Sequence, residues 1–242
     1  MRQLADKYSE FSKQLFVCYI DFRKAFDSVW RKCLWTVMRH YGYPKKIVKI
    51  LENAYKDTFS TVTVGGSLTE QFKTVVGVLQ GDVPSPLLFA IFLEIIVVTL
   101  LKDIDIGAWI NGHRLTDLRF ADEIALLAES ERSLQEVLSS LWQNSMQMRM
   151  KINVAKTETQ LLGYGSGSLS IELKGQHLKH TDEFVYLGGV INSVEGTEAD
   201  VKQRIGIARG IFQMLSKIWT ERDLSKALKT EVFEVMVISA LF

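Results

Sequence analysis

The chain has 242 residues, of which 47% are hydrophobic and 24% are charged, and its formal net charge is +1. This length allows one large domain or two small ones, and 16 Gly with 3 Pro exclude a collagen-like or disordered chain. Two cysteines, Cys18 and Cys33, are too few for a disulfide scaffold and fit a reducing compartment.

The charge is unevenly distributed along the chain. Residues 1–60 carry 12 Lys and Arg against 6 Asp and Glu, whereas residues 61–150 carry 6 against 11. Residues 151–242 carry 11 of each. A basic region beside an acidic one can guide a polyanion to one face of a molecule, although many proteins show such asymmetry by chance.

Neither a targeting segment nor a membrane span is predicted. The first ten residues mix acidic and basic side chains, unlike a signal peptide. The most apolar stretch, residues 83–101, contains two prolines and Glu94, which favours a buried helix over a membrane span. We therefore expect an intracellular protein, nuclear or cytoplasmic, that is neither secreted nor membrane-bound. The sequence leaves its oligomeric state open.

The hydrophobic pattern predicts intermixed strands and helices. Residues 15–21 are apolar, β-branched and aromatic, which predicts a buried strand that ends in Asp21. The next predicted elements are helices over 30–41 and 45–56, a hairpin joining 61–64 to 72–76 across Gly65-Gly66, a helix over 86–101, a hairpin across Asn111-Gly112, and a hairpin joining 117–121 to 124–128 with its turn at Asp122-Glu123. The last are a helix over 132–148, strands at 159–163, 169–173 and 184–191, and helices around 197–218 and 223–240. This order predicts an α+β fold around one mainly antiparallel sheet.

Two groups of carboxylates have unusual settings. Asp21 ends a hydrophobic strand, and Asp122-Glu123 lies between two apolar runs. If these strands are neighbours, the carboxylates converge at one sheet edge and form an oxygen-rich site suited to Mg²⁺. Alternatively, Asp122-Glu123 closes a solvated turn and Asp21 caps the following helix. Because acidic turn residues are common, spacing alone favours this second interpretation.

Five segments, in order along the chain, together resemble the reverse transcriptase of non-LTR (LINE-type) retrotransposons. Residues 120–123, Phe-Ala-Asp-Glu, are similar to motif C of that family, which usually reads Phe-Ala-Asp-Asp. The other segments resemble motif A (residues 16–27), motif B (residues 76–88, with Gln-Gly followed by Ser-Pro), motif D (residues 151–158) and the primer-gripping hairpin (residues 184–188). The resemblance implies a polymerase palm with an antiparallel sheet packed on helices, plus a partial helical thumb.

The resemblance also implies the catalytic residues. Asp21 and Asp122 would bind metal, with the backbone carbonyl of Phe22 as a further ligand, and Glu123 would be the third catalytic carboxylate. The implied cofactor is Mg²⁺ as two ions, with Mn²⁺ as a substitute. Two such ions form the usual clamp for in-line phosphoryl transfer.

Further residues are implied to bind the substrates. Phe22 and Phe26 would contact the incoming nucleotide, with Phe26 excluding a 2′-hydroxyl. Without the motif, Phe26 would be interpreted as ordinary core packing. The remaining implied contacts are Gln80 and Gly81 with the nucleotide and template base, Lys156 with the triphosphate, and Tyr186, Leu187 and Gly188 with the primer. The implied partners are an RNA template, a DNA primer and dNTPs.

The chain departs from the family pattern at several positions. Glu123 replaces an Asp, which moves that carboxylate outward by one C–C bond, roughly 1.5 Å. Asp82 and Pro84 replace small or apolar residues in motif B. Residues 1–165 are interpreted as a palm with the fingers largely missing, and residues 166–242 as the connecting hairpin and a partial thumb.

Three functional hypotheses follow. The first is an RNA-directed DNA polymerase domain fragment that adds dNTPs to a DNA 3′-hydroxyl on an RNA template. The second is a catalytically inactive retrotransposon remnant that binds at most RNA or a partner. The third is another palm-type phosphotransferase, such as a nucleotide cyclase, against which the matches to motifs B and D argue.

Overall fold

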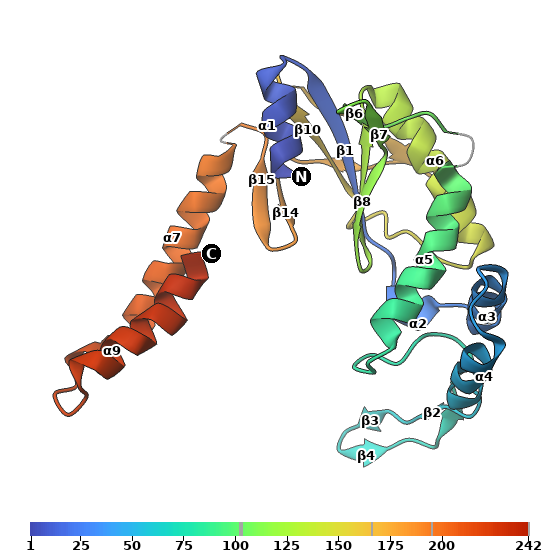
Figure 1. Ribbon diagram of the computed structural model, residues 1–242, viewed down its shortest axis with the longest axis horizontal. Coiled ribbons are helices and arrows are strands. Elements are labelled where there is room, and N and C mark those ends of the chain that lie inside the picture. The colour runs from blue at the N-terminus through green and yellow to red at the C-terminus, as the bar shows by residue number, and fades with distance from the viewer. Residues whose placement is uncertain (102–103, 166, 195, 242) are drawn as a thin grey trace. The chain divides into compact units, whose positions relative to one another are not determined.

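The computed structural model describes residues 1–101, 104–165, 167–194 and 196–241 (Figure 1). Its helices are α1 (Arg2–Glu10), α2 (Ala25–Ser28), α3 (Arg31–His40), α4 (Lys45–Ala54), α5 (Ser85–Leu101), α6 (Glu131–Gln147), α7 (Thr197–Met214), α8 (Ser216–Thr220) and α9 (Lys226–Val232), then the π-helical η1 (Phe233–Val237) and the 3₁₀ η2 (Ile238–Leu241). Its strands are β1 (Gln14–Ile20), β2 (Phe59–Ser60), β3 (Thr63–Val64), β4 (Ser67–Leu68), β5 (Phe72–Lys73), β6 (Ala108–Ile110), β7 (His113–Leu115), β8 (Asp117–Phe120), β9 (Glu123–Ala128), β10 (Glu158–Gly163), β11 (Glu172–Leu173), β12 (Gln176–His177), β13 (Lys179–His180), β14 (Glu183–Tyr186) and β15 (Gly189–Asn192).

The chain forms two compact units, each discontinuous in the sequence. The larger unit comprises residues 15–159 and 168–180, and the smaller comprises residues 1–14, 160–167 and 181–242. Compact units need not coincide with functional domains. The palm and thumb boundary expected between residues 165 and 166 therefore stays a prediction.

A five-stranded sheet in the order β13-β10-β1-β9-β8 is the framework of the fold. Strands β1 and β9 pair antiparallel with Ile20 opposite Ile124, and β8 pairs antiparallel with β9. The pairing of β10 with β13 is parallel. Because β9 is buried from Ile124 to Ala128, its register is set by the apolar side chains of the core. The predicted α+β fold with antiparallel strands packed on helices is confirmed.

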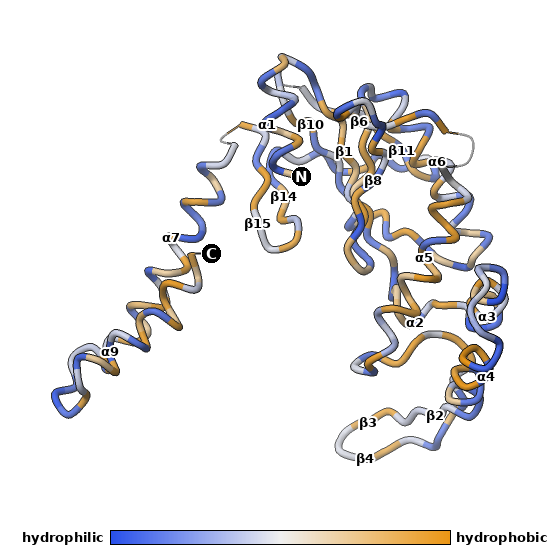
Figure 2. Tube along the Cα trace, in the orientation of Figure 1, coloured by the Kyte–Doolittle hydropathy of each residue, from blue (hydrophilic) through white to orange (hydrophobic). Residues whose placement is uncertain are grey.

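Helix α5 lies at the centre of the helical layer in the larger unit, where it contacts α3 and α6, and α6 in turn packs on β9. Figure 2 shows that α5 is hydrophobic along nearly its whole length. Phe89, Phe92 and Ile96 are fully buried there, and Glu94 forms a 2.7 Å ion pair with Arg119 of β8. Among the residues that the structure describes, no helix has both the length and the apolar character needed to cross a bilayer.

The smaller unit is organised around the buried carboxylate of Asp200 in α7. Its oxygens accept a 2.9 Å hydrogen bond from the Val190 amide of β15 and form ion pairs of 2.7 Å with Arg2 and 2.9 Å with Arg204. Burial alone would raise the pKa of Asp200, but the amide and the two guanidinium groups lower it to about 2. Asp200 therefore joins α1, β15 and α7.

Most of the predicted elements are confirmed, including the strand before Asp21, the helices now seen as α3, α4, α5 and α6, and the hairpin across Asn111-Gly112. The partner predicted for residues 61–64 is wrong. Residues Thr63–Val64 pair with Ser67–Leu68, and Phe72–Lys73 pair with β2 instead. A two-residue turn at Gly65-Gly66, both with positive φ, allows only this short register.

Three other predictions need correction. The β8–β9 turn comprises Ala121 and Asp122, because Phe120 pairs with Glu123 and thereby places Glu123 in the strand. The strand predicted over 184–191 is the β14–β15 hairpin, and only Glu172–Leu173 of the strand predicted over 169–173 is in strand. The two helices predicted at the end of the chain are divided at Leu215 and at Phe233. Helices α1 and α2 were not predicted, and α2 has only four residues.

Candidate active site

The side chain of Asp21 is held in place by residues distant in the sequence. It immediately follows β1 and is half-buried. Its Oδ2 accepts a 3.0 Å hydrogen bond from Nδ2 of Asn153, and its amide donates to Thr157 Oγ1 at 3.3 Å. The suggestion that Asp21 caps the next helix is wrong, because Lys24 occupies the N-terminal boundary of α2.

The second carboxylate lies in the β8–β9 turn. Ala121 has a φ of +51°, a conformation that costs free energy for any residue with a Cβ. Asp122 is half-buried and Glu123 is exposed. Among the described residues, no hydrogen bond or ion pair engages the carboxylates of Asp122 and Glu123. This side of the site is therefore built from a constrained backbone with unrestrained carboxylates.

The sheet topology brings these two sides together. Ile20, which precedes Asp21, is opposite Ile124, which follows Glu123. The end of β1 and the start of β9 consequently lie at the same edge of the sheet. The two strands are therefore neighbours, which is the arrangement in which the sequence predicts that the carboxylates converge.

The donors at this edge suit a hard cation that shares its ligands with a substrate. No group of three or more His, Cys, Asp or Glu side chains able to hold a metal is present in the part of the chain that the structure describes. Magnesium, however, usually takes one or two carboxylates, with water and substrate phosphates completing its shell. Among the described residues, the Phe22 carbonyl has no hydrogen-bond partner, so Asp21, Asp122 and this carbonyl fit such an ion.

Residues 151–157 lie beside the end of β1. Phe22 forms an isolated antiparallel bridge with Ile152, and the Asn153 amide donates to the Asp21 carbonyl at 2.8 Å. The amides of Lys156 and Thr157 both donate to the Asn153 carbonyl, which makes a tight turn. The structure thus places the exposed Lys156 in a turn tethered to Asp21 through Asn153 and Thr157.

The segment containing Gln80 and Gly81 is attached to the segment that follows Asp21. The Gly77 amide donates to the Val29 carbonyl, and the Val78 amide donates to the Phe26 carbonyl, each at 2.8 Å. Gly77 has a φ of +83°, and a Cβ there would lie 2.8 Å from the Asp27 carbonyl oxygen, so only glycine fits this approach.

The next residues of this loop are exposed. Gln80 Nε2 donates to Asp27 Oδ1 at 3.4 Å, and a Cβ on Gly81 would meet open space. The hydroxyl of Tyr55 donates to Asp82 Oδ2 at 3.4 Å and also contacts Ser85 Oγ at 3.1 Å. Asp82, a departure from the family pattern, therefore has a local hydrogen-bond partner.

Phe26 is half-buried, and its ring stacks on that of the fully buried Phe89, with centroids 4.7 Å apart. Such stacking fixes the ring plane and leaves part of the side chain accessible. Phe26 is therefore both a core contact and a surface group.

Arg31 supports this region, although no motif in the sequence singles it out. It is only 6% exposed, and its guanidinium donates to the carbonyls of Gly77 at 2.6 Å, Thr74 at 2.8 Å and Tyr55 at 3.0 Å, and to Thr58 Oγ1 at 2.7 Å. Burial lowers the pKa of Arg31. Its place on the buried stripe of α3, with Leu34, Trp35 and Met38, is the signal that could have revealed it.

Tyr186, Leu187 and Gly188 lie in the smaller unit, at the turn between β14 and β15. Tyr186 pairs with Gly189, so the turn comprises Leu187 and Gly188, with φ of +52° and +78°. Tyr186 is buried, whereas Leu187 and Gly188 are exposed at the tip.

Comparison with known proteins identifies the family. Residues 1–191 match the family described as reverse transcriptase (RNA-dependent DNA polymerase). The chain is 29% identical over 186 residues to the Pol polyprotein of the type-2 retrotransposable element R2DM of Drosophila melanogaster, covering 73% of the chain and 17% of the relative. It is 25% identical over 185 residues to the RNA-directed DNA polymerase from mobile element jockey of Drosophila funebris, covering 72% of the chain and 19% of the relative.

Solved structures show the same fold. Telomerase from Candida tropicalis, in complex with a fragment of telomeric RNA, superposes with a TM-score of 0.56 at 15% identity, covering 99% of this chain and 39% of that one. The apo form from the same species superposes with a TM-score of 0.56 over 81% of this chain and 34% of that one. The chain spans less than a fifth of the two retrotransposon polyproteins. It belongs to the reverse transcriptase family, with homologues among the non-LTR retrotransposons.

Proposed function

We propose that this chain is the catalytic core of an RNA-directed DNA polymerase that works by a two-metal mechanism. The observation that carries the proposal is the meeting of Asp21 and Asp122 at one edge of the sheet, within a chain of the reverse transcriptase family. The reaction joins the 3′-oxygen of a DNA primer to the α-phosphorus of a dNTP and releases pyrophosphate.

Asp21, Asp122 and the Phe22 carbonyl would hold two Mg²⁺ ions, for which Mn²⁺ could substitute, and Glu123 would add negative charge beside them. Ions bound there would supply activation of the attacking hydroxyl and neutralisation of charge on the leaving group. The hydrogen bond from Asn153 supports this role, because it orients the Asp21 carboxylate before any ligand arrives.

The remaining predicted residues contact the substrates. Phe26, held by its stacking on Phe89, lies under the sugar and excludes a 2′-hydroxyl. The other proposed contacts are Gln80 and Gly81 with the nucleotide and template base, Lys156 with the triphosphate, and Tyr186, Leu187 and Gly188 with the primer end. An RNA template is consistent with the telomerase neighbour that was solved with telomeric RNA.

Primer extension tests this proposal. The purified chain is incubated with an oligo(dT) primer on poly(rA), dTTP and Mg²⁺. We expect the wild type to incorporate dTTP and Asp21→Asn to incorporate none. Chelation of Mg²⁺ should stop incorporation by the wild type, and an excess of Mn²⁺ should restore it. Asp105→Asn, which removes an exposed carboxylate paired with Arg114, is the matched control and retains activity. Incorporation that survives Asp21→Asn overturns the assigned site.

A second candidate is a non-catalytic RNA-binding domain. It is favoured by the exposure of Glu123, the residue that departs from the usual Phe-Ala-Asp-Asp motif. Under this alternative, RNA binds in a salt-dependent way while labelled dTTP is never incorporated with either metal.

A further inference from the structure

Most of the positive charge of residues 1–60 is concentrated on helices α3 and α4 and the residues that flank them. Residues 30–56 contain seven Lys and Arg against one acidic residue, Glu52. Arg31 is buried, and Arg39 forms a 2.6 Å ion pair with Glu52. Glu52 therefore pairs with only one of the seven basic residues, and most of the positive charge of this stretch is not neutralised by a carboxylate within it.

Three lysines of α4 are exposed and, among the described residues, unpaired. Lys45, Lys46 and Lys49 are exposed, and within the described part of the chain no carboxylate pairs with any of them. Lys45, Lys49 and Asn53 are spaced at i, i+4 and i+8, so they follow one face of the helix. An anion on this face meets two ammonium groups and an amide that both donates and accepts hydrogen bonds.

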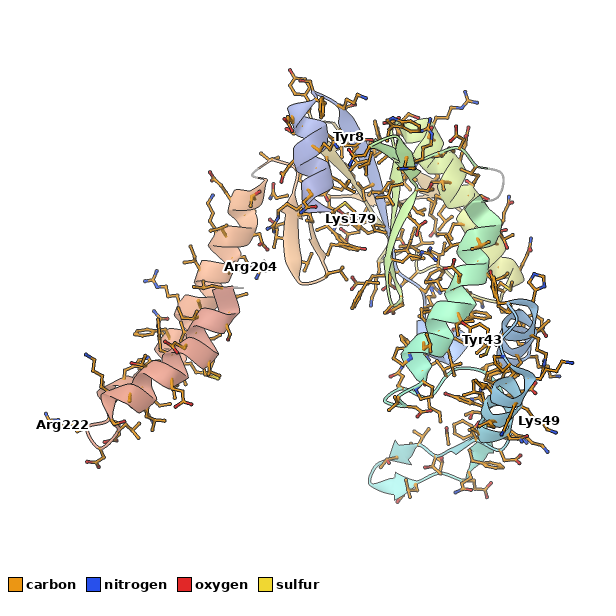
Figure 3. All side chains as sticks on the ribbon, viewed as in Figure 1. Tyr8, Tyr43, Lys49, Lys179, Arg204 and Arg222 are labelled. Carbon is orange, nitrogen blue, oxygen red and sulfur yellow. The ribbon has the colours of Figure 1, made fainter. Side chains whose placement is uncertain are left out.

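The same face is hollowed beside exposed aromatic rings. A cavity of about 660 Å³ is lined by Tyr43, Lys45, Lys49 and Asn53, together with Arg39, Gly42, Pro44 and Glu52. Tyr43 and Tyr41 are 37% and 43% exposed in the turn between α3 and α4. Figure 3 shows Tyr43 at this turn and Lys49 on the following helix.

We propose that this basic face, defined as Tyr41, Tyr43, Lys45, Lys46, Lys49 and Asn53, binds single-stranded RNA outside the catalytic edge. Sites for single strands combine lysines that follow the phosphates with aromatic rings on which bases stack. The cavity is within the size range that accepts a small organic group such as a base that is free of its stack. Pairing with Arg39 limits the repulsion that Glu52 exerts on phosphate.

Lysines that contact phosphates and rings that stack on bases would also accept single-stranded DNA. The choice of RNA rests on the proposed function, in which an RNA template extends beyond the residues at the catalytic edge. Binding itself needs neither Mg²⁺ nor dNTPs. The two proposals can therefore fail separately.

Fluorescence anisotropy in EDTA tests the inference, with a labelled 20-nucleotide oligouridine, the matching oligothymidine, and a 20-base-pair RNA duplex. We expect the oligouridine to bind most tightly. The variant Lys45→Gln/Lys46→Gln/Lys49→Gln should weaken binding on the order of tenfold and make the log–log salt dependence shallower by about 2, since a single strand contributes about 0.7 per phosphate contact.

The controls separate this face from general charge effects. Arg132→Gln/Lys174→Gln/Lys179→Gln removes the same formal charge from other elements of the larger unit, where Arg132 is paired with Glu136 and Lys179 with Glu158, and should change affinity less than twofold. Tyr43→Ala should weaken binding about fivefold, whereas Tyr43→Phe, which keeps the ring, should bind like the wild type. Asp21→Asn should also bind RNA normally, even where it abolishes primer extension.

Several results would overturn the inference: no binding of the oligouridine at 50 mM salt, equal losses from both triple variants, or duplex binding as tight as that of the single strand. Tighter binding of oligothymidine than of oligouridine would overturn the assignment to RNA. If RNA binding depends on the α4 lysines while primer extension never occurs, the inference stands and the proposed polymerase activity fails.

Discussion

The two sides of the candidate active site are built in different ways. Asp21 is fixed by Asn153 and Thr157, and the segment that follows it is hydrogen-bonded to the loop at Gly77. Asp122, on the other side, has no such contact among the described residues and lies in a turn with Ala121 at positive φ. The fold therefore orients one carboxylate in advance and leaves the other to be oriented by what binds.

Under the proposed function, this difference determines how each carboxylate would serve a cation. A rigid carboxylate sets the location of a ligand, whereas a mobile one can adjust to a change in coordination. Changes on the Asp21 side should therefore affect both folding and metal use. Changes on the Asp122 side should affect activity while folding stays the same.

The sharpest test of this comparison is Asp122→Asn. Removing the charge should lower primer extension by about a thousandfold, because the proposed metal site would lose one of its two principal carboxylates. The free energy of unfolding, measured by urea denaturation, should stay within about 0.5 kcal/mol of the wild type, because no hydrogen bond is lost. A large loss of stability would show that Asp122 has a structural role and would break the comparison.

Arg31→Met tests the support beneath the Asp21 side. It leaves the Gly77, Thr74 and Tyr55 carbonyls and the Thr58 hydroxyl without their donor, so we expect unfolding to become easier by about 3 kcal/mol. Arg31→Lys should recover only part of this loss, because an ammonium group lacks the planar fork. If the methionine variant unfolds at the urea concentration of the wild type, Arg31 does not support this region.

Asn153→Ala removes the side chain that orients Asp21. Primer extension should fall about 10- to 100-fold, in the range typical of a lost outer-shell contact. The Mg²⁺ concentration for half-maximal rate should rise, and this readout separates positioning from simple destabilisation. An unchanged Mg²⁺ dependence would indicate that Asp21 needs no help from Asn153.

Ala121→Gly should relieve backbone strain in the β8–β9 turn. Glycine adopts positive φ without a steric penalty, so we expect stability to rise by about 1 kcal/mol, measured as a shift in the urea midpoint. Primer extension should fall a few-fold, because Asp122 is then held in a looser turn. A destabilised glycine variant would mean that Ala121 makes favourable contacts that outweigh its strain.

The smallest effect is expected for Glu123→Asp. Shortening this exposed side chain restores the usual motif and should raise the Mg²⁺-dependent rate about two- to threefold. Glu123→Gln is the control, because it keeps the length and removes the charge. A rate that falls with aspartate would show that the longer carboxylate is the better fit for this site.

Local pattern was enough to predict much of the fold. The apolar run before Asp21, the helical spacing in residues 30–56 and the Asn111-Gly112 turn each depend on interactions within a few residues. The predicted turn at Asp122-Glu123 was wrong by one residue, because its register depends on burial of Ile124 opposite Ile20 on another strand.

The sequence by itself determined the family and the α+β class and singled out the candidate carboxylates, because motif spacing and hydrophobic period are properties of the chain alone. Only the tertiary structure decided that β1 and β9 are neighbours, that Asn153 orients a carboxylate 132 positions away and that Arg31 is a buried donor to four oxygens. Such contacts join distant segments, and their partners are selected by the packing of the whole core rather than by the residues beside them.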